Sequence, residues 1–158
     1  MAEKSSKTWL WIALGVAVVG GLWLMRQANR ISVGGASVRV HKISAFGVEL
    51  HVDLSIINES RLTIDVYGFL GQIFFKDTAI GVVQMLQPAT LAAHAPGSVA
   101  FKADISYVSL LTLGLDLTKI LKGDVTNFKN IPWADFKIKG TLRAEGFDVP
   151  IDQPLLTA

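Results

Sequence analysis

The chain has 158 residues, no cysteine and a formal net charge of +2 at neutral pH. The lack of cysteine excludes a disulfide framework, a thiolate nucleophile and a zinc ribbon. The first 30 residues carry a net charge of +3, whereas the remaining 128 hold 11 basic and 12 acidic side chains. The main domain therefore has no basic field, which argues against a nucleic acid as its ligand.

An uncharged apolar run at residues 8–25 follows a polar tail at residues 1–7. As an α-helix, its 18 residues would span about 27 Å, close to the thickness of the hydrocarbon core of a bilayer. We therefore predict a single transmembrane helix, with the lipid bilayer as its partner. Side chains that favour the membrane interface flank this run, and we expect them to be interface anchors: Trp9, Trp11, Trp23, Lys7, Arg26 and Arg30.

The alternative for residues 8–25 is a cleaved signal peptide. No small-x-small cleavage site follows the run, which favours an uncleaved anchor. Within it, Ala13, Ala17 and Gly21 recur every fourth residue and share one helix face. This spacing lets membrane helices pack closely, although membrane helices are rich in small residues in any case. We take these three residues as a candidate helix-packing face.

Basic residues lie on both sides of the apolar run, so the positive-inside rule does not fix its orientation. A short N-terminal signal-anchor commonly delivers the segment that follows it. We therefore expect the domain to be extracytoplasmic, or to face the shell in a membrane-containing virion.

Residues 26–36 are predicted to be a juxtamembrane connector, and residues 37–153 a β domain. Apolar and polar residues alternate most regularly at residues 48–56, as in a strand with one buried face. Further runs typical of strands, separated by turn signals, lie at residues 62–66, 69–75, 79–86, 99–105, 136–144 and 147–151. This pattern predicts a mainly β fold, an antiparallel fibronectin- or Ig-like sandwich of about seven strands.

Residues 107–122 depart from this rhythm, because their leucines recur at intervals of three and four. The pattern predicts a helix, with Ser106 or Ser109 as its N-terminal cap and Gly123 just past its end. We expect this helix to close one end of the sandwich. The alternative is a helix that lies on the membrane surface.

Three short motifs connect this order of elements to a known family. Asn58 follows Ile57 at the end of the first long strand, Ile80 precedes Gly81 in a later strand, and residues 146–151 read Gly-Phe-Asp-Val-Pro-Ile. Over residues 37–153 the chain resembles the type 2 late-embryogenesis-abundant domain, also called the water-stress and hypersensitive-response domain. Where family members commonly have Asn-Pro-Asn, this chain has Asn58-Glu59-Ser60. The resemblance implies a seven-stranded fibronectin-like sandwich with one helix and no catalytic residues.

Candidate chemical groups are few. Glu49, His51 and Asp53 are spaced by two, so they project from one face of one strand and could hold a cation or transfer protons. The alternative is that they form the solvated face of a half-buried strand, which is polar in any case. No metal-spaced histidine pair or phosphate-binding loop is present, and we predict no catalytic residue, no cofactor and no metal.

Two further features have both a functional and a structural interpretation. Asn58-Glu59-Ser60 matches a glycosylation acceptor, which is a frequent chance match. Trp133, which follows Pro132, is a candidate partner contact, and the alternative is that it plugs the end of the core.

These observations favour a non-enzymatic, single-pass membrane protein. In this hypothesis, the domain holds other proteins of a membrane-associated assembly, or its own copies, at a cell envelope or at the membrane of a virion. The family resemblance implies a different function, stress protection or lipid binding. An enzyme that uses Glu49, His51 and Asp53 is the third hypothesis, and the sequence offers least for it.

Overall fold

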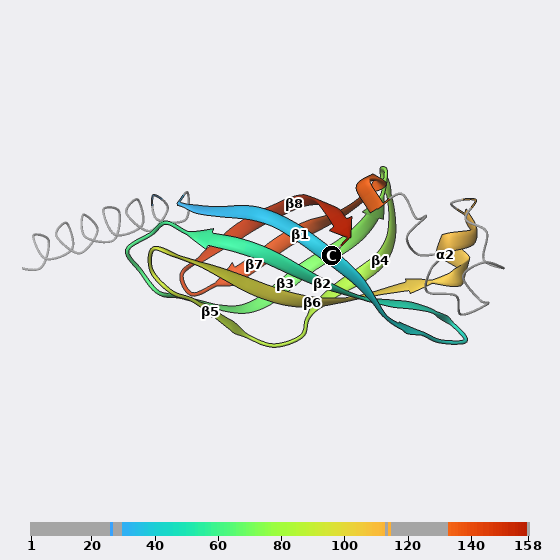
Figure 1. Ribbon diagram of the computed structural model, residues 1–158, viewed down its shortest axis with the longest axis horizontal. Coiled ribbons are helices and arrows are strands. Elements are labelled where there is room, and N and C mark those ends of the chain that lie inside the picture. Colours follow the sequence, from blue (N-terminus) through green and yellow to red (C-terminus); the bar gives the residue numbers. More distant parts are fainter. Residues whose placement is uncertain (1–25, 27–29, 113, 115–132, 158) are drawn as a thin grey trace, which may run out of the picture.

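A computed structural model describes residues 26, 30–112, 114 and 133–157 (Figure 1). The described part is mainly β. In chain order its elements are β1 (Ile31–Ile43), β2 (Gly47–Asn58), β3 (Ile64–Phe75), β4 (Thr78–Met85), β5 (Ala89–Leu91), β6 (Ala95–Ser106), helix α2 (Tyr107–Thr112), the 3-10 turn η2 (Trp133–Asp135), β7 (Phe136–Ala144) and β8 (Phe147–Thr157).

The strands pair into one closed sheet. Neighbours follow the order β4-β6-β2-β1-β8-β7-β3, and β3 pairs back to β4, so that these seven strands form a ring. The short β5 pairs with β3 beyond the part of β3 that contacts β4. Every pairing among the described strands is antiparallel except that of β1 with β8, where residues 36–38 run parallel to residues 155–157.

The predicted mainly β class is confirmed, and the strand pairings are antiparallel except that of β1 with β8. A sandwich would consist of two separate sheets, whereas the described strands are hydrogen-bonded around a complete ring. The closing contacts are β3 with β4 on one side and β1 with β8 on the other. The pairing of β1 with β8, the first and last strands in chain order, cannot be predicted from the local alternation of residue types.

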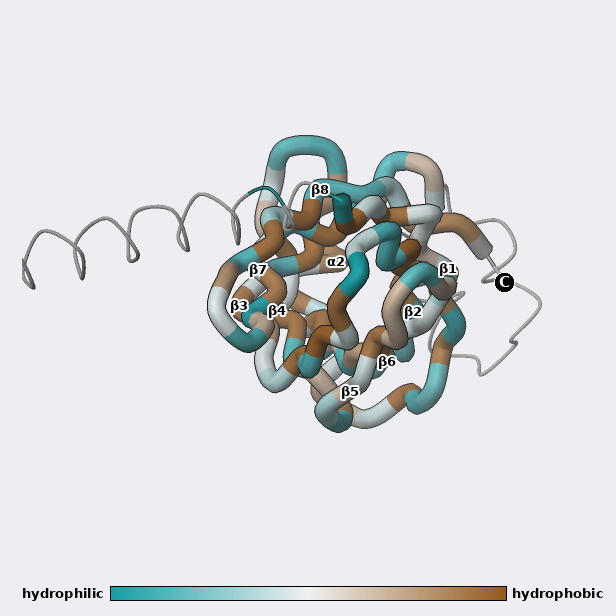
Figure 2. Tube along the Cα trace, turned by 90° about the vertical axis from the view of Figure 1, so that its left-hand side faces the viewer, coloured by the Kyte–Doolittle hydropathy of each residue, from teal (hydrophilic) through white to brown (hydrophobic). Residues whose placement is uncertain are grey.

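The core fills the inside of the ring, because alternate residues of the strands are buried there. Figure 2 views the strands from one end of the ring and colours the chain by hydropathy. In β2, for example, Val52, Leu54 and Ile56 are fully buried, and the intervening residues face outward. The ring of Phe69 lies 4.7 Å from that of Phe101, measured between centroids. Each such side chain stabilises the fold by about 1.5–3 kcal/mol through burial.

β1 begins at Ile31, inside the predicted connector at residues 26–36. Its first residues pair with the last residues of β2, starting from Ile31 opposite Asn58. The sheet therefore starts before the predicted boundary at residue 37. At the other end, β8 extends to Thr157, beyond the predicted boundary at residue 153.

The helix predicted at residues 107–122 is present at its start. The hydroxyl of Ser106 accepts a hydrogen bond of 3.1 Å from the backbone N–H of Ser109, so Ser106 is the N-terminal cap. The helix ends at Thr112, and Gly114 has a φ of 72°, a left-handed conformation that an α-helix cannot contain. A continuous helix from 107 to 122 is therefore wrong, and residues 115–122 lie outside the described part.

The transmembrane helix predicted at residues 8–25 also lies outside the described residues. Among the residues that are described, none belongs to a helix with the length and apolar character needed to cross a bilayer.

Candidate functional site

The outer face of β1, β2 and β6 carries a group of charged and imidazole side chains. The strand register determines which of them are neighbours. Glu49 of β2 lies opposite Asp104 of β6, and His51 lies opposite Lys102. On the other side of β2, His51 lies opposite Arg39 of β1. Glu49 also lies opposite Lys42 of β1, so Glu49 and His51 each have a polar or charged residue opposite them on both sides.

A β-bulge in β1 adds His41 to this group. Val40 pairs with Leu50 and Lys42 pairs with Glu49, so His41 is an extra residue in β1 without a register partner. In such a bulge, two residues of one strand oppose a single residue of the other, and side chains are redirected. Here the bulge places the His41 ring over the ring of His51.

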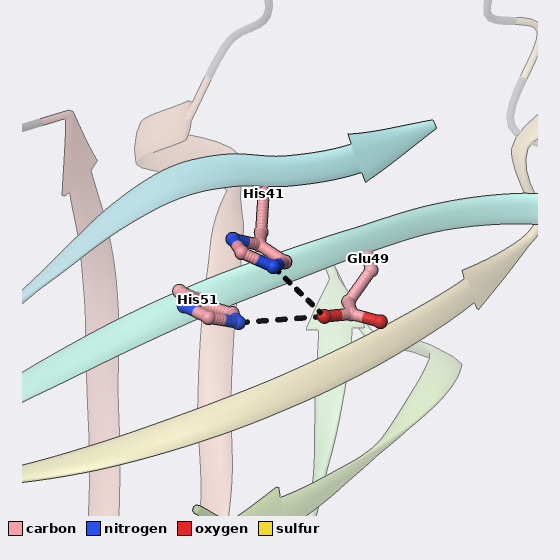
Figure 3. Close-up of side chains that lie close together, drawn as sticks. All are labelled: His41, Glu49 and His51. Carbon is pink, nitrogen blue, oxygen red and sulfur yellow. Dashed lines mark ion pairs between the residues drawn. The ribbon is translucent and has the colours of Figure 1, made fainter. Parts of the chain in front are cut away.

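His41, Glu49 and His51 form a compact cluster, which we call the His–Glu–His cluster (Figure 3). The two imidazole rings stack with their centroids 3.8 Å apart and their planes 9° apart. Both rings direct Nε2 to the same carboxylate oxygen, Oε1 of Glu49, at 3.8 Å from His41 and 3.4 Å from His51. The side chains of His51 and Glu49 are only 16% and 22% exposed, whereas that of His41 is 52% exposed.

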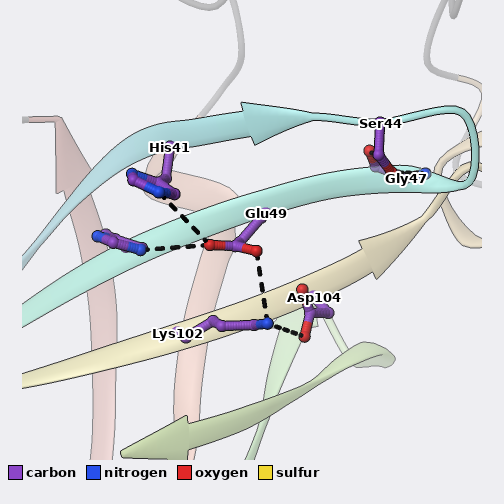
Figure 4. A network of polar contacts seen from close by, with 7 residues as sticks. His41, Ser44, Gly47, Glu49, Lys102 and Asp104 are labelled. Atoms are coloured by element: carbon purple, nitrogen blue, oxygen red, sulfur yellow. Dashed lines mark hydrogen bonds and ion pairs between the residues drawn. The ribbon is translucent and has the colours of Figure 1, made fainter. Parts of the chain in front are cut away.

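The second oxygen of Glu49 faces β6 (Figure 4). Lys102 Nζ lies 3.4 Å from Glu49 Oε2 and 3.3 Å from Asp104 Oδ2, so one ammonium group joins two carboxylates. Partial burial raises the pKa of Glu49, but the hydrogen bond and charge of Lys102, the hydrogen bond with His51 and the charge of His41 together lower it below its ordinary value. Hydrogen bonds and charges from Asp104 and then from Glu49 raise the pKa of Lys102.

A groove of about 390 Å³ adjoins the cluster at the β1–β2 turn. Glu49 belongs to the cluster and also lines the groove. The groove is further lined by Lys42, Ser44, Phe46 and Asp104. Ser44 stabilises the turn, because its hydroxyl accepts hydrogen bonds of 3.2 Å from the backbone N–H groups of Phe46 and Gly47. The Tyr107 hydroxyl donates a 2.6 Å hydrogen bond to the Ser44 carbonyl, which connects the turn to α2.

The expected set of Glu49, His51 and Asp53 is only partly brought together. Asp53 does face outward, but it pairs with Arg39 at 3.8 Å and is not part of the cluster. His41 takes its place. The sequence held a partial signal, because His41 and His51 flank the same tight turn and would be close in a hairpin. The bulge that aligns them leaves no mark in the pattern of residue types.

The remaining candidate residues are exposed, buried or outside the described part of the chain. Arg26 and Arg30 are exposed. Trp133 is buried, at 8% exposure, and its ring centroid lies 5.2 Å from that of Phe136. This burial agrees with the alternative that Trp133 plugs the end of the core. The predicted anchors and packing residues that lie outside the described part are Lys7, Trp9, Trp11, Ala13, Ala17, Gly21 and Trp23.

No protein-family model matches the chain. No curated protein matches it either. Among solved structures, the chain is similar to a crystal structure of a protein from Archaeoglobus fulgidus, with 14% sequence identity and a TM-score of 0.46. The match covers 80% of this chain and 100% of the archaeal chain.

Proposed function

We propose that this protein is a non-enzymatic interaction module, which an anchor at residues 8–25 holds at a membrane. The module binds other proteins of a membrane-associated assembly, or further copies of itself. In this proposal, the domain lies outside the cytoplasm or faces the shell of a membrane-containing virion. The membrane is that of a cell envelope or a virion.

The observation that carries this proposal is the position of exposed apolar side chains relative to the start of the sheet. β1 has 13 residues and therefore runs for about 40 Å from its start to the β1–β2 turn. The turn and helix α2 lie together at the end that is remote from the start of β1 (Figure 1). Phe46 in this turn is 87% exposed, and Val108 and Leu111 of α2 are 71% and 59% exposed.

We call Phe46, Val108 and Leu111 the distal apolar residues. A hydrogen bond of 3.2 Å from the Tyr107 N–H to the Phe46 carbonyl holds the turn against α2. The three side chains are thus presented by two elements that are fixed to each other. Exposed aromatic and aliphatic groups of this kind are typical of contact surfaces. A domain tethered through β1 would present them away from the membrane.

The test compares assemblies of the full chain extracted in a mild detergent. We expect a complex larger than the monomer by light scattering, and we expect Phe46→Ser together with Val108→Ser to reduce it to the monomer. Leu70→Ser is the matched control, because Leu70 is also exposed but lies in β3. A monodisperse monomer of the unchanged protein, with no partner, would contradict the proposal.

A second experiment addresses the anchor and the orientation. Protease is added to intact cells or particles, and the C-terminal domain is detected by an antibody. The proposal requires the domain to stay with the membrane fraction after washing in high salt, and to be cleaved from outside intact cells. Release by salt would rule out the anchor, and complete protection would rule out the extracytoplasmic side.

The second candidate function is stress protection or lipid binding, as the resemblance to the type 2 late-embryogenesis-abundant domain implies. That resemblance also implies a fibronectin-like sandwich as the specific fold within the mainly β class. One observation supports this candidate, because the family-like Asn58 is buried and has a structural role at the end of β2. Deletion of the gene and measurement of survival after drying tests it, and unchanged survival would argue against it.

A further inference from the structure

We propose that the His–Glu–His cluster binds a divalent transition-metal ion of the zinc class, with Nε2 of His41, Nε2 of His51 and Oε1 of Glu49 as its protein ligands. This site is independent of the proposed interaction function. The argument starts from geometry, because the ligand atoms of these three residues all lie within 4.8 Å of one another.

The separations of these atoms suit one shared ion. Zinc binds imidazole nitrogen and carboxylate oxygen at about 2.0–2.2 Å, so two ligand atoms of a tetrahedral site lie about 3.4 Å apart. The His51 to Glu49 distance is 3.4 Å, and the His41 to Glu49 distance is 3.8 Å. The lone pair of Nε2 lies in the plane of its ring, so the two nearly parallel rings must tilt out of their stack for both nitrogens to face one ion. The ion would replace the hydrogens that Nε2 otherwise directs to the carboxylate.

The donor set selects the class of metal. Imidazole nitrogen favours zinc, copper, nickel and iron, whereas magnesium and calcium require oxygen ligands. Two histidines and one carboxylate form a known zinc ligand set that leaves a fourth position open. In this cluster His41 is the most exposed of the three, so water has access to the open side.

Groups around the ligands fix the carboxylate in position. Lys102 holds Oε2 of Glu49, which leaves Oε1 directed at the two histidines. Hydrogen bonds to the second oxygen of a ligating carboxylate commonly orient it. Asp104 lies on the other side of Lys102 and offsets its positive charge. The charge of Lys42, which lies opposite Glu49 in the register, counts against the ion.

The site also gives the bulge a purpose. Without the extra residue, His41 would pair directly with Glu49, and its ring would have no reason to stack on that of His51. A metal would join the bulged part of β1 to β2 through side chains, at a point where the backbone ladder is interrupted.

The test is calorimetric titration of the full chain in detergent, without a polyhistidine tag, with zinc chloride and with magnesium chloride. We expect one zinc ion per chain and no binding of magnesium. His41→Ala and His51→Ala should each raise the Kd for zinc at least tenfold, since even residues that only support metal ligands change affinity by about 10–100-fold. His94→Asn is the matched control, because His94 is exposed, outside the cluster and at a positive φ that asparagine tolerates.

Copper(II) provides a second readout. Electron paramagnetic resonance of the copper-loaded protein should show two coupled imidazole nitrogens, and His41→Ala should show one. Circular dichroism verifies that each variant folds. If a histidine variant does not fold, Glu49→Gln, which keeps the side-chain shape, is tested in its place. A lack of zinc binding by the unchanged protein, or equal Kd values in all variants, would overturn the proposal.

Discussion

Asn58 and Ser60 are the polar residues with no exposed surface in the described part of the chain. The amide nitrogen of Asn58 donates to the carbonyls of Leu62, Leu91 and Ala92 at 2.8–3.1 Å. Its amide oxygen accepts from the hydroxyl of Ser60 at 2.6 Å. One side chain thus connects the end of β2, the following loop and β5. A glycan could not be attached to this amide while the domain is folded.

Replacement of Asn58 by alanine would remove the amide donor from the buried hydrogen bond to the Leu91 carbonyl and from the part-buried one to the Ala92 carbonyl, whereas the Leu62 carbonyl would keep the Ser60 hydroxyl as a donor. We expect Asn58→Ala to lower the free energy of unfolding by about 3 kcal/mol, since each unsatisfied buried group costs about 1–3 kcal/mol. Urea denaturation measures the change. Glu59→Gln, at the exposed position between the two buried residues, should stay within about 0.5 kcal/mol of the unchanged protein. Equal stability of Asn58→Ala would mean that the network contributes nothing.

Glu49 makes the stability depend on pH. Its pKa in the folded protein lies below the ordinary value of 4.5, so the folded state favours the charged carboxylate. The stabilisation that the Glu49 carboxylate gives the folded state is therefore present above pH 4.5. It is lost as the pH falls through the lower pKa that Glu49 has in the folded protein. In the presence of a chelator, Glu49→Gln should be less stable than the unchanged protein at neutral pH, and the difference should shrink in acid. A difference that is constant with pH would contradict this.

At the scale of elements, close packing between β3 and β7 depends on a pair of glycines. Gly71 and Gly140 lie directly opposite each other in the register. A Cβ on Gly140 would lie 2.4 Å from the Leu70 carbonyl oxygen and 2.6 Å from the Phe69 ring. The ring of Phe69 thus occupies the space that two missing side chains leave. No rule of strand alternation predicts this arrangement.

We expect Gly140→Ala to destabilise the domain by about 2–3 kcal/mol, because the added methyl group meets backbone that cannot move independently. Gly68→Ala is the control, since a Cβ there would make ordinary contacts at 3.8 Å with the Arg143 side chain. Thermal unfolding of the two variants compares them. A larger loss for Gly68→Ala would show that the close approach is not what matters.

The elements that the sequence predicted well are those with strictly local signals. The alternation at residues 48–56 lies within β2, and the serine before the leucine-rich segment is the cap of α2. The end of α2 was missed, because the leucine spacing continues past Gly114 although the backbone there is left-handed. Two of the three cluster residues, Glu49 and His51, were predicted from β2 alone. His41 was missed because its position depends on a register shift between two strands.

At the scale of the whole molecule, the ring depends on the contact between β1 and β8. Three residue pairs form this parallel contact, and Leu155 within it is fully buried. Leu155→Ala should lower the free energy of unfolding by about 3 kcal/mol, as for other large core residues. Leu156→Ala, at the exposed neighbouring position, should change it little. Equal effects of the two substitutions in urea denaturation would mean that this side of the ring is not packed as described.

The same contact imposes an order of events during synthesis. β1 is the first strand of the sheet to leave the ribosome and β8 is the last, yet the two are neighbours in the ring. Loop closure between such distant segments is slow, and unpaired strand edges favour aggregation. Until β8 has been made, β1 has its β8-facing edge unpaired. A nascent chain stalled before β8 is made should therefore be more sensitive to protease than a chain from which β8 has emerged.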